Sequence, residues 1–327
     1  MRLTITLFIL FLCRLLFPES AHAQEKSNDT LINQVPDSII KNKTSGQDLP
    51  GEVRTPGSSR DGEKRSYFRA EVDYTSDNVY LGRKDSSAIR YLSPEFGYFA
   101  RSGFFTEATF NFLASAGNSR LDMMGLSAGY SFSHLKYEGE ISATRFYYNS
   151  QSTNVRSEVK DEISYNNSFE FGLIKPTLSM TLSVGNNTDL GGSIGLEHNF
   201  SIVDDKVDIT PAFAANASTQ NYYNNYYKKR RFIARKKGSQ PIPGTVTTTG
   251  EVLNASTFKI LDYEASLPIS YEAGRFSFAF TPVYAIPVHP AEVIITSKFS
   301  NGTTTSKTEF EKINNCFFAT LEISYKF

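Results

Sequence analysis

The sequence predicts an all-β fold, a closed antiparallel transmembrane β-barrel of about twelve strands in an up-and-down meander. Three observations lead to this prediction. Apolar and polar residues alternate along most of the chain after residue 66, the chain begins with a secretory signal, and it ends on phenylalanine. Alternation with a period of two gives a strand one apolar and one polar face, and a closed barrel satisfies every backbone hydrogen bond inside lipid.

Residues 1–23 have the layout of a signal peptide. Arg2 precedes an almost wholly apolar run over residues 3–17, and the small-residue motif Ala21-His22-Ala23 follows. This layout is typical of a cleaved secretory signal, whereas a membrane-spanning helix needs about 20 apolar residues. We expect cleavage after this motif. Lipid attachment at Cys13 is the alternative, although two bulky residues precede it.

Residues 24–65 are rich in Ser, Asn, Asp, Lys, Gly and Pro and nearly free of aromatic residues. A segment of this composition buries too little apolar surface to offset the entropy lost on ordering. We therefore expect a disordered periplasmic leader, with a plug that folds back into the barrel as the alternative. The barrel is expected to occupy residues 66–327.

The overall composition excludes some classes of partner. The formal net charge is zero, which gives no reason to expect binding to nucleic acid. Removal of the signal leaves Cys316 as the only cysteine, so no intrachain disulfide can form. The chain has 26 Phe, 18 Tyr and no Trp. Phe and Tyr recur near the ends of the expected strands, where membrane barrels carry aromatic girdles.

The strands are predicted from alternation, segment by segment. In the first, Phe68 and Val72 lie on one side, and Arg69, Glu71 and Asp73 lie on the other. The last segment, which ends at Phe327, alternates in the same way. The predicted strands are around 67–76, 88–100, 104–115, 121–132, 136–148, 163–173, 177–184, 189–203, 206–221, 261–271, 275–289 and 315–327.

The connections between these strands differ at the two ends of the barrel. One end has only tight turns, at 101–103, 134–135, 174–175, 204–205 and 273–274. The other end has most of the long connections, at 77–87, 149–160, 222–257 and 290–314. Bacterial outer-membrane barrels combine short periplasmic turns with longer extracellular loops. The pattern therefore predicts an outer-membrane location with both termini on the periplasmic side.

Three stretches resemble those of known barrels. The aromatic ending at Phe327 is similar to the ending of many Gram-negative outer-membrane proteins, which implies recognition by the barrel-insertion machinery. The turn patterns SDNVYLGR (76–83) and PEFGYFARSGFF (94–105) resemble those of Bacteroidota-type porin-like barrels of unassigned function. A soluble β-sandwich is the alternative, because its alternation would be nearly identical strand by strand.

Acidic residues dominate the polar face that would line the lumen. Carboxylates along a low-dielectric wall favour cations and repel anions. Alternatively, they pair with inward bases such as Arg69 and Lys326 and brace a narrow or closed lumen. The candidate pore-lining residues are Glu71, Asp73, Glu95, Glu107, Glu138, Glu140, Glu170, Glu197, Asp262, Glu264 and Glu322.

The longest connection, 222–257, carries a dense run of bases behind four tyrosines. On the outer surface this run could bind lipopolysaccharide phosphates or an anionic solute, because Arg and Lys suit phosphate. The alternatives are a solvated hairpin at the end of an extended strand and a constriction folded into the lumen. The bases of this extracellular loop are Lys228, Lys229, Arg230, Arg231, Arg235, Lys236 and Lys237.

The sequence gives little support for catalysis. After the signal, the histidines are His134, His198 and His289, and each falls near a predicted strand end. We expect no enzymatic activity, no cofactor and no metal, with a barrel hydrolase as a minor alternative. The leading hypothesis is porin-like passage of small solutes with a cation bias. The alternative function is a closed structural or surface-interaction barrel that binds anionic partners through the basic loop. The sequence leaves the oligomeric state open.

Overall fold

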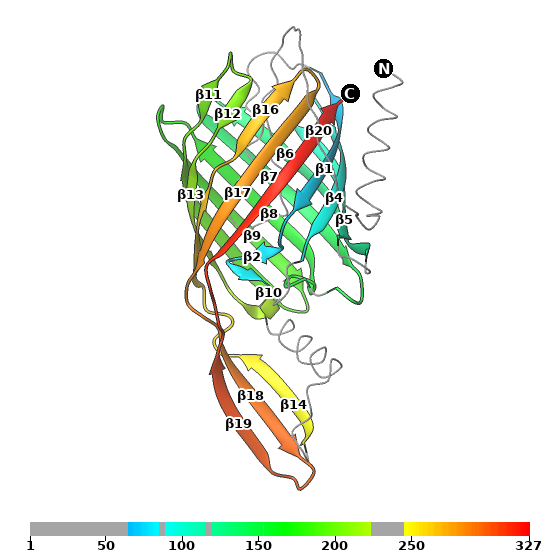
Figure 1. Ribbon diagram of the computed structural model, residues 1–327, viewed down its shortest axis with the longest axis vertical. Coiled ribbons are helices and arrows are strands. Elements are labelled where there is room, and N and C mark those ends of the chain that lie inside the picture. Colours follow the sequence, from blue (N-terminus) through cyan, green and yellow to red (C-terminus); the bar gives the residue numbers. More distant parts are fainter. Residues whose placement is uncertain (1–64, 85–88, 115–118, 153, 224–244) are drawn as a thin grey trace, which may run out of the picture. The chain divides into compact units, whose positions relative to one another are not determined.

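The computed structural model describes residues 65–84, 89–114, 119–152, 154–223 and 245–327. In this part of the chain, twelve strands form a closed antiparallel barrel in up-and-down order (Figure 1), which confirms the predicted fold class. The barrel strands are β1 (Tyr67–Thr75), β4 (Tyr91–Phe99), β5 (Phe104–Leu113), β6 (Arg120–His134), β7 (Tyr137–Tyr148), β8 (Val159–Phe169), β9 (Lys175–Gly185), β10 (Thr188–Glu197), β13 (Ala212–Ser218), β15 (Lys259–Ser266), β17 (Phe276–Pro287) and β20 (Cys316–Lys326).

The barrel closes where the first strand pairs with the last, a pairing that we call the seam. Strand β1 pairs antiparallel with β20, so that Arg69 faces Lys326 and Asp73 faces Glu322. Strand β20 pairs on its other side with β17. At the short-turn end the sheet is extended by β11 (Phe200–Ile202), β12 (Val207–Ile209) and β16 (Ile269–Ala273).

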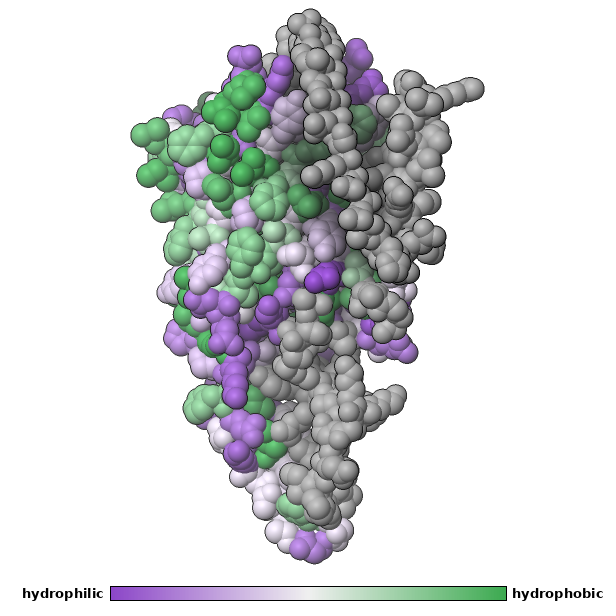
Figure 2. All heavy atoms as spheres, in the orientation of Figure 1, coloured by the Kyte–Doolittle hydropathy of each residue, from purple (hydrophilic) through white to green (hydrophobic). Residues whose placement is uncertain are grey.

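The two faces of the barrel wall differ as the alternation predicts. Along β1, buried polar residues alternate with apolar residues that are more exposed. Phe68, Phe104 and Ile194 on the outer face are 59%, 63% and 67% exposed. In Figure 2, apolar residues gather over the visible barrel wall. Such a large apolar surface on a folded chain indicates a lipid or protein environment around the wall.

One outward prediction is wrong. The alternation over 261–271 places Leu261 on the lipid-facing side, but its side chain is fully buried. The pairing of β13 with β15 shifts register between Asn216 and Ala217, so Leu261 has no partner residue across the strand. A bulge of this kind redirects the side chain. Leu261 therefore packs among the connections at one end of the barrel.

The long connections contain more strand than the sequence suggests. The connections predicted at 222–257 and 290–314 contribute β14 (Thr245–Val252), β18 (Glu292–Phe299) and β19 (Thr304–Phe310), which form a separate three-stranded sheet. The 77–87 connection contains the hairpin of β2 (Val79–Tyr80) and β3 (Arg83–Lys84). Strands β14, β18 and β19 are rich in Thr, Val or Ile, which favour strand structure.

Some predictions concern residues outside the described part of the chain. These are the signal at 1–23, nearly all of the leader at 24–65, and the seven bases of the 228–237 run. None of the described residues forms a helix that is long and apolar enough to cross a membrane.

Candidate functional site

The barrel interior is the candidate functional site, because it gathers most of the acids selected from the sequence. Every one of them except Glu170 lies on the inward phase of its strand, and most of their side chains are buried. The inward acids are Glu71, Asp73, Glu95, Glu107, Glu138, Glu140, Glu197, Asp262, Glu264 and Glu322. Glu170 is exposed, because β8 ends at Phe169 and Glu170 begins the turn that follows.

Arg69 links three inward carboxylates from neighbouring strands. Its Nη2 lies 2.8 Å from Oε1 of Glu95 and 2.9 Å from Oε1 of Glu107, and its Nε lies 3.3 Å from Oε2 of Glu71. The side chains of all four residues are at most 4% exposed. Thr109 donates a hydrogen bond to the other oxygen of Glu95. Arg69 thus brings carboxylates from three strands of the wall to one guanidinium.

Gly97 makes room for this network. It lies between Arg69 on β1 and Glu107 on β5 in the register of the sheet. A Cβ atom on Gly97 would lie 2.7 Å from Cε2 of Phe99 and 3.2 Å from Cγ of Glu107. The absence of a side chain lets the Phe99 ring approach, with the Arg69 guanidinium 4.8 Å from its centroid. The aromatic ring and the three carboxylates together fix the position of the guanidinium.

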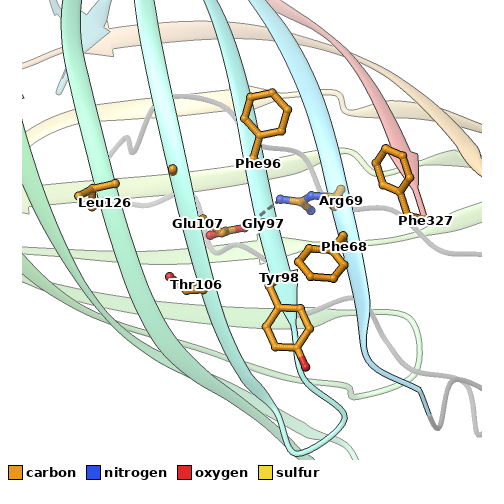
Figure 3. Close-up of a pocket in the computed structure, with 10 residues that line it drawn as sticks. Phe68, Arg69, Phe96, Gly97, Tyr98, Thr106, Glu107, Leu126 and Phe327 are labelled. Carbon is orange, nitrogen blue, oxygen red and sulfur yellow. Dashed lines mark hydrogen bonds and ion pairs between the residues drawn. The ribbon is translucent and has the colours of Figure 1, made fainter. Parts of the chain in front are cut away.

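On the outer side of the same wall, an apolar groove of about 680 Å³ crosses β1, β4, β5 and β6. Figure 3 shows the rings of Phe68 and Phe96 beside the Arg69–Glu107 ion pair. The groove is lined by Phe68, Arg69, Phe96, Gly97, Tyr98, Thr106, Glu107, Ala108, Leu126 and Phe327. Arg69 and Glu107 thus border the groove together with Gly97, which lies between them in the register of the sheet.

Residues of the connections pack together at the end of the barrel that carries the long connections, which we call the mouth. They belong to a buried apolar cluster, which we call the cap. Its tyrosines Tyr80 and Tyr222 meet edge to face, with ring centroids 5.0 Å apart. The cap consists of Tyr80, Leu81, Met123, Phe146, Val155, Val159, Tyr222, Tyr223, Val252, Ala255, Leu261, Ala291 and Val293. The alternation does not predict the cap, because most of its members belong to connections.

The β2–β3 hairpin enters the mouth through a tight two-residue turn. Leu81 and Gly82 both have positive φ, at 51° and 68°, as the favoured hairpin turn requires. A Cβ atom on Gly82 would lie 2.7 Å from Cβ of Pro287 and 3.1 Å from Cβ of Asp262. Glycine is therefore needed both for the backbone conformation and for the close approach to the wall.

Arg83 of this hairpin fastens the cap to the wall. Its Nη1 donates to the carbonyls of Leu81 and Leu261 at 2.7 and 3.2 Å, and its Nη2 donates to that of His289 at 3.0 Å. Its Nε lies 3.3 Å from Oε2 of Glu311. Glu311 also accepts hydrogen bonds from the Tyr223 hydroxyl and from the Ala291 amide. Arg83 is nearly fully buried, so these contacts act without competition from bulk water.

A second loop base enters the interior at Arg156. Its Nη2 forms an ion pair with Oε2 of Glu162 on β8, and its guanidinium lies 4.8 Å from the centroid of the Tyr80 ring. Sequence reasoning misses both Arg83 and Arg156, because it assigns inward charges only to strand positions. The clue available for Arg83 is the tight-turn pair Leu81-Gly82, which marks a hairpin short enough to fold into the mouth.

Two inward acids anchor the connections at the mouth. Asp189 accepts the amides of Asn221 and Tyr222 at 2.7 and 2.8 Å and the Thr219 hydroxyl at 2.7 Å. Asp122 accepts the hydroxyls of Tyr91 and Ser152 in the same way. These carboxylates hold the loop backbone against the barrel, so the cap is attached at several strands.

The pKa values of several side chains in the cap and the hairpin are shifted by their surroundings. Desolvation raises the pKa of the Tyr80 phenol above its ordinary value, although the Arg156 guanidinium opposes the shift. Desolvation likewise raises the pKa of the Tyr222 phenol. At the edge of the hairpin, the hydrogen bond that the Lys84 ammonium donates to the Asp77 carboxylate raises the pKa of Lys84. Tyr80 and Tyr222 are therefore neutral over the whole physiological range.

The three histidines occupy the strand ends at which the sequence places them. His134 ends β6 and is exposed, and His198 packs edge to face on Phe200 with ring centroids 4.1 Å apart. Nδ1 of His289 lies 2.8 Å from the carbonyl oxygen of Ile260. The contacts of His198 and His289 are thus to an aromatic ring and to a backbone group.

Comparison with known proteins supplies no family. The chain matches no protein-family model and no curated protein. Solved structures that resemble it are outer-membrane barrels. The translocator domain of the autotransporter NalP from Neisseria meningitidis is 11% identical, with 82% of this chain and 90% of that chain covered and a TM-score of 0.40.

Two further structures show similar values. The outer membrane channel DcaP of Acinetobacter baumannii is 8% identical, with 80% and 96% of the two chains covered and a TM-score of 0.31. OmpF of Salmonella typhi is 11% identical, with 80% and 97% covered and a TM-score of 0.30. At these values the likeness carries no argument about family or activity. The evidence for a closed twelve-strand barrel with a buried acidic interior and an apolar cap comes from the chain's own strand pairing and burial.

Proposed function

We propose that the protein is an outer-membrane channel for small cations whose mouth is closed by the cap until the connections move. The observation that carries this proposal is the gathering of ten acids on the inner face of the barrel wall, three of which, Glu71, Glu95 and Glu107, contact Arg69. Acidic groups inside a low-dielectric wall attract cations and exclude anions.

The outer-membrane location is supported by the outer surface. Exposed aliphatic and aromatic side chains cover the wall, and rings cluster near the short-turn end. Examples are the pairs Phe68 with Tyr98 and Tyr325 with Phe327, whose ring centroids lie 4.9 and 4.8 Å apart. Such rings favour the interface between lipid and water. We place both termini on the periplasmic side, in agreement with the short turns at that end.

Two partners belong to the same proposal. Phe327 is 66% exposed at the end of β20, so it is accessible to the barrel-insertion machinery. The bases of the 228–237 run would contact lipopolysaccharide phosphates if the long connections face the cell exterior.

The ion preference is tested by the reversal potential in a planar bilayer under a potassium chloride gradient. We expect the wild-type protein to give a reversal potential whose sign indicates a preference for cations. Glu264→Gln removes an inward carboxylate, and Glu107→Gln leaves Arg69 less neutralised, so each should shrink that potential. Arg145→Gln serves as the control, because Arg145 is 60% exposed. A reversal potential whose sign indicates a preference for anions would reject the cation preference. A reversal potential that is unchanged in both Glu variants would reject it as well.

A closed barrel that works as a structural or surface-interaction protein is the second candidate. The buried apolar cap at the mouth favours it, because packed apolar side chains at this end would hinder the passage of ions. Absence of any conductance over a range of salt and voltage would favour this candidate over the channel.

A further inference from the structure

Within the described part of the chain, strand β19 has a partner on only one side. The separate sheet has the order β14–β18–β19, so β19 lies at its edge and pairs with β18 alone (Figure 1). No described residue pairs with the other side of β19, and all seven of its residues are exposed. Such an edge presents a row of N–H and C=O groups to which a further strand can bind.

This edge has few of the features that keep other strands away. Proline, bulges and unbalanced charge are the usual ones. The pairing of β19 with β18 has no bulge, and the strand sequence TTSKTEF contains no proline. The charge of Lys307 is balanced by Glu309, whose Oε1 lies 3.3 Å from Nζ of Lys307. The edge is therefore suited to the addition of a strand.

The hydrogen bonds of the sheet show which residues offer their backbone to the free edge. Directly after β19, the Glu311 amide donates to the carbonyl of Ala291, in continuation of the β18–β19 register. Hydrogen-bonded pairs alternate along an antiparallel ladder, so the odd-numbered residues of β19 bond toward β18. The N–H and C=O groups of Ser306, Thr308 and Phe310 therefore point toward the free edge.

We propose that β19 pairs antiparallel with β19 of a second copy of this chain, centred on Thr308. In this register Thr308 faces its own counterpart, and Ser306 faces Phe310 of the second copy. These are hydrogen-bonded pairs that use the backbone groups of the free edge. Lys307 of each copy faces Glu309 of the other at a non-hydrogen-bonded position, where the side chains lie closer together.

Charge selects this register over its neighbours. Opposite charges that face each other across a strand pair stabilise it, whereas like charges destabilise it. A pairing centred on Lys307 would place two lysines opposite each other, and one centred on Glu309 would place two glutamates opposite each other. The register centred on Thr308 instead forms two equivalent ion pairs, as two-fold symmetry requires. The association is separate from solute passage, because β19 contributes no strand to the barrel wall.

The first test measures the mass of the processed full-length protein in detergent micelles by sedimentation. Micelles leave two copies free to take the orientation that the strands require. A single strand pair is a small interface, so we expect a weak dimer that forms as the protein concentration rises. A monomer at every concentration up to the millimolar range would overturn the proposal.

Charge variants test the register. Lys307→Glu places like charges opposite each other at two positions and should weaken the dimer about tenfold. The double variant Lys307→Glu with Glu309→Lys restores both ion pairs and should return to the wild-type affinity. The two side chains are 75% and 48% exposed, so these changes spare the fold. Lys298→Glu, at an exposed position of the central strand β18, is the control and should have no effect. A Lys307→Glu variant that dimerises as the wild type does would overturn the proposal.

A cysteine at the centre locates the contact. Facing residues of a hydrogen-bonded pair have Cα atoms about 5.5 Å apart, which is within the range of a disulfide. Thr308→Cys should therefore give a covalent dimer under mild oxidation. Thr304→Cys, on the same exposed edge but remote from its counterpart, is the control and should stay monomeric. The native Cys316 is buried. Equal cross-linking of the two variants would show random collision and would overturn the proposed contact.

Discussion

At the scale of single residues, Arg69 and Gly97 show how an acidic interior can fold. The guanidinium reaches across β4 to β5, and it can do so only because Gly97 has no side chain between Arg69 and Glu107. Burial of Arg69 and the three carboxylates costs much desolvation energy. The ion pairs offset this cost because they are well aligned and buried. The interior is therefore sensitive to changes at either residue.

Replacement of Arg69 by Ala should destabilise the barrel strongly. The change takes the cation from Glu71, Glu95 and Glu107, and loss of one partner of a buried ion pair costs about 3–5 kcal/mol. Arg145→Ala is the matched control, because the Arg145–Asp161 pair is 60% and 46% exposed. Such exposed pairs contribute at most about 1 kcal/mol. Unfolding by guanidinium in detergent measures both, and equal losses would contradict the role of Arg69.

Gly97→Ala should lower the free energy of unfolding by about 1–3 kcal/mol, as overpacking of a tight site does. The new Cβ would lie 2.7 Å from the Phe99 ring. Gly125→Ala is the control on the same inner face, because its nearest atom, Cδ1 of Phe146, is at the ordinary distance of 3.7 Å. If Gly97→Ala proved as stable as Gly125→Ala, the close approach described here would be wrong.

At the scale of elements, the strands follow from the sequence and the mouth does not. Every strand of the barrel has one apolar and one polar side, so a period of two identifies it without knowledge of its neighbours. The cap depends on contacts between connections that are distant in sequence, such as Tyr80 with Tyr222. Local alternation carries no information about such contacts, and the bulge that buries Leu261 is invisible to it for the same reason.

Part of the missed structure nevertheless had a local signal. The connection 290–314 contains Asn301-Gly302 between β18 and β19, and this pair is a strong hairpin signal. Gly302 has a φ of 84° in that turn. For the interior, the inward phase of the acids was predictable from alternation. Their partners Arg83 and Arg156 were not, because both come from connections.

Alkaline pH should loosen the cap. The pKa of each buried phenol, Tyr80 and Tyr222, is raised above the unfolded value of about 10. Their contribution to stability is therefore complete below that pH and is lost as the pH rises through the folded pKa. Phenolate absorbance during a pH titration should show that Tyr80→Phe removes a late-titrating group. Loss of a group that titrates near 10 instead would show that Tyr80 is not buried in solution.

At the scale of the whole molecule, the chain places apolar side chains outward and acids inward, with both ends of the sheet joined at the seam. The outer surface is apolar, the inner face is rich in acids, and the cap lies at the mouth. Arg83 connects the cap to the wall, because its side chain holds the β2–β3 hairpin to backbone carbonyls of Leu261 and His289 and to Glu311.

Conductance of Arg83→Ala beside the wild-type protein in planar bilayers tests this account most directly. Loss of the buried guanidinium should release the hairpin, so the variant should open more often than the wild type and pass cations in preference to anions. Lys84→Ala is the matched control in the same hairpin, because Lys84 is 44% exposed and pairs only at the edge with Asp77. It should behave as the wild type. Silence in Arg83→Ala, or channels that prefer anions, would contradict the account.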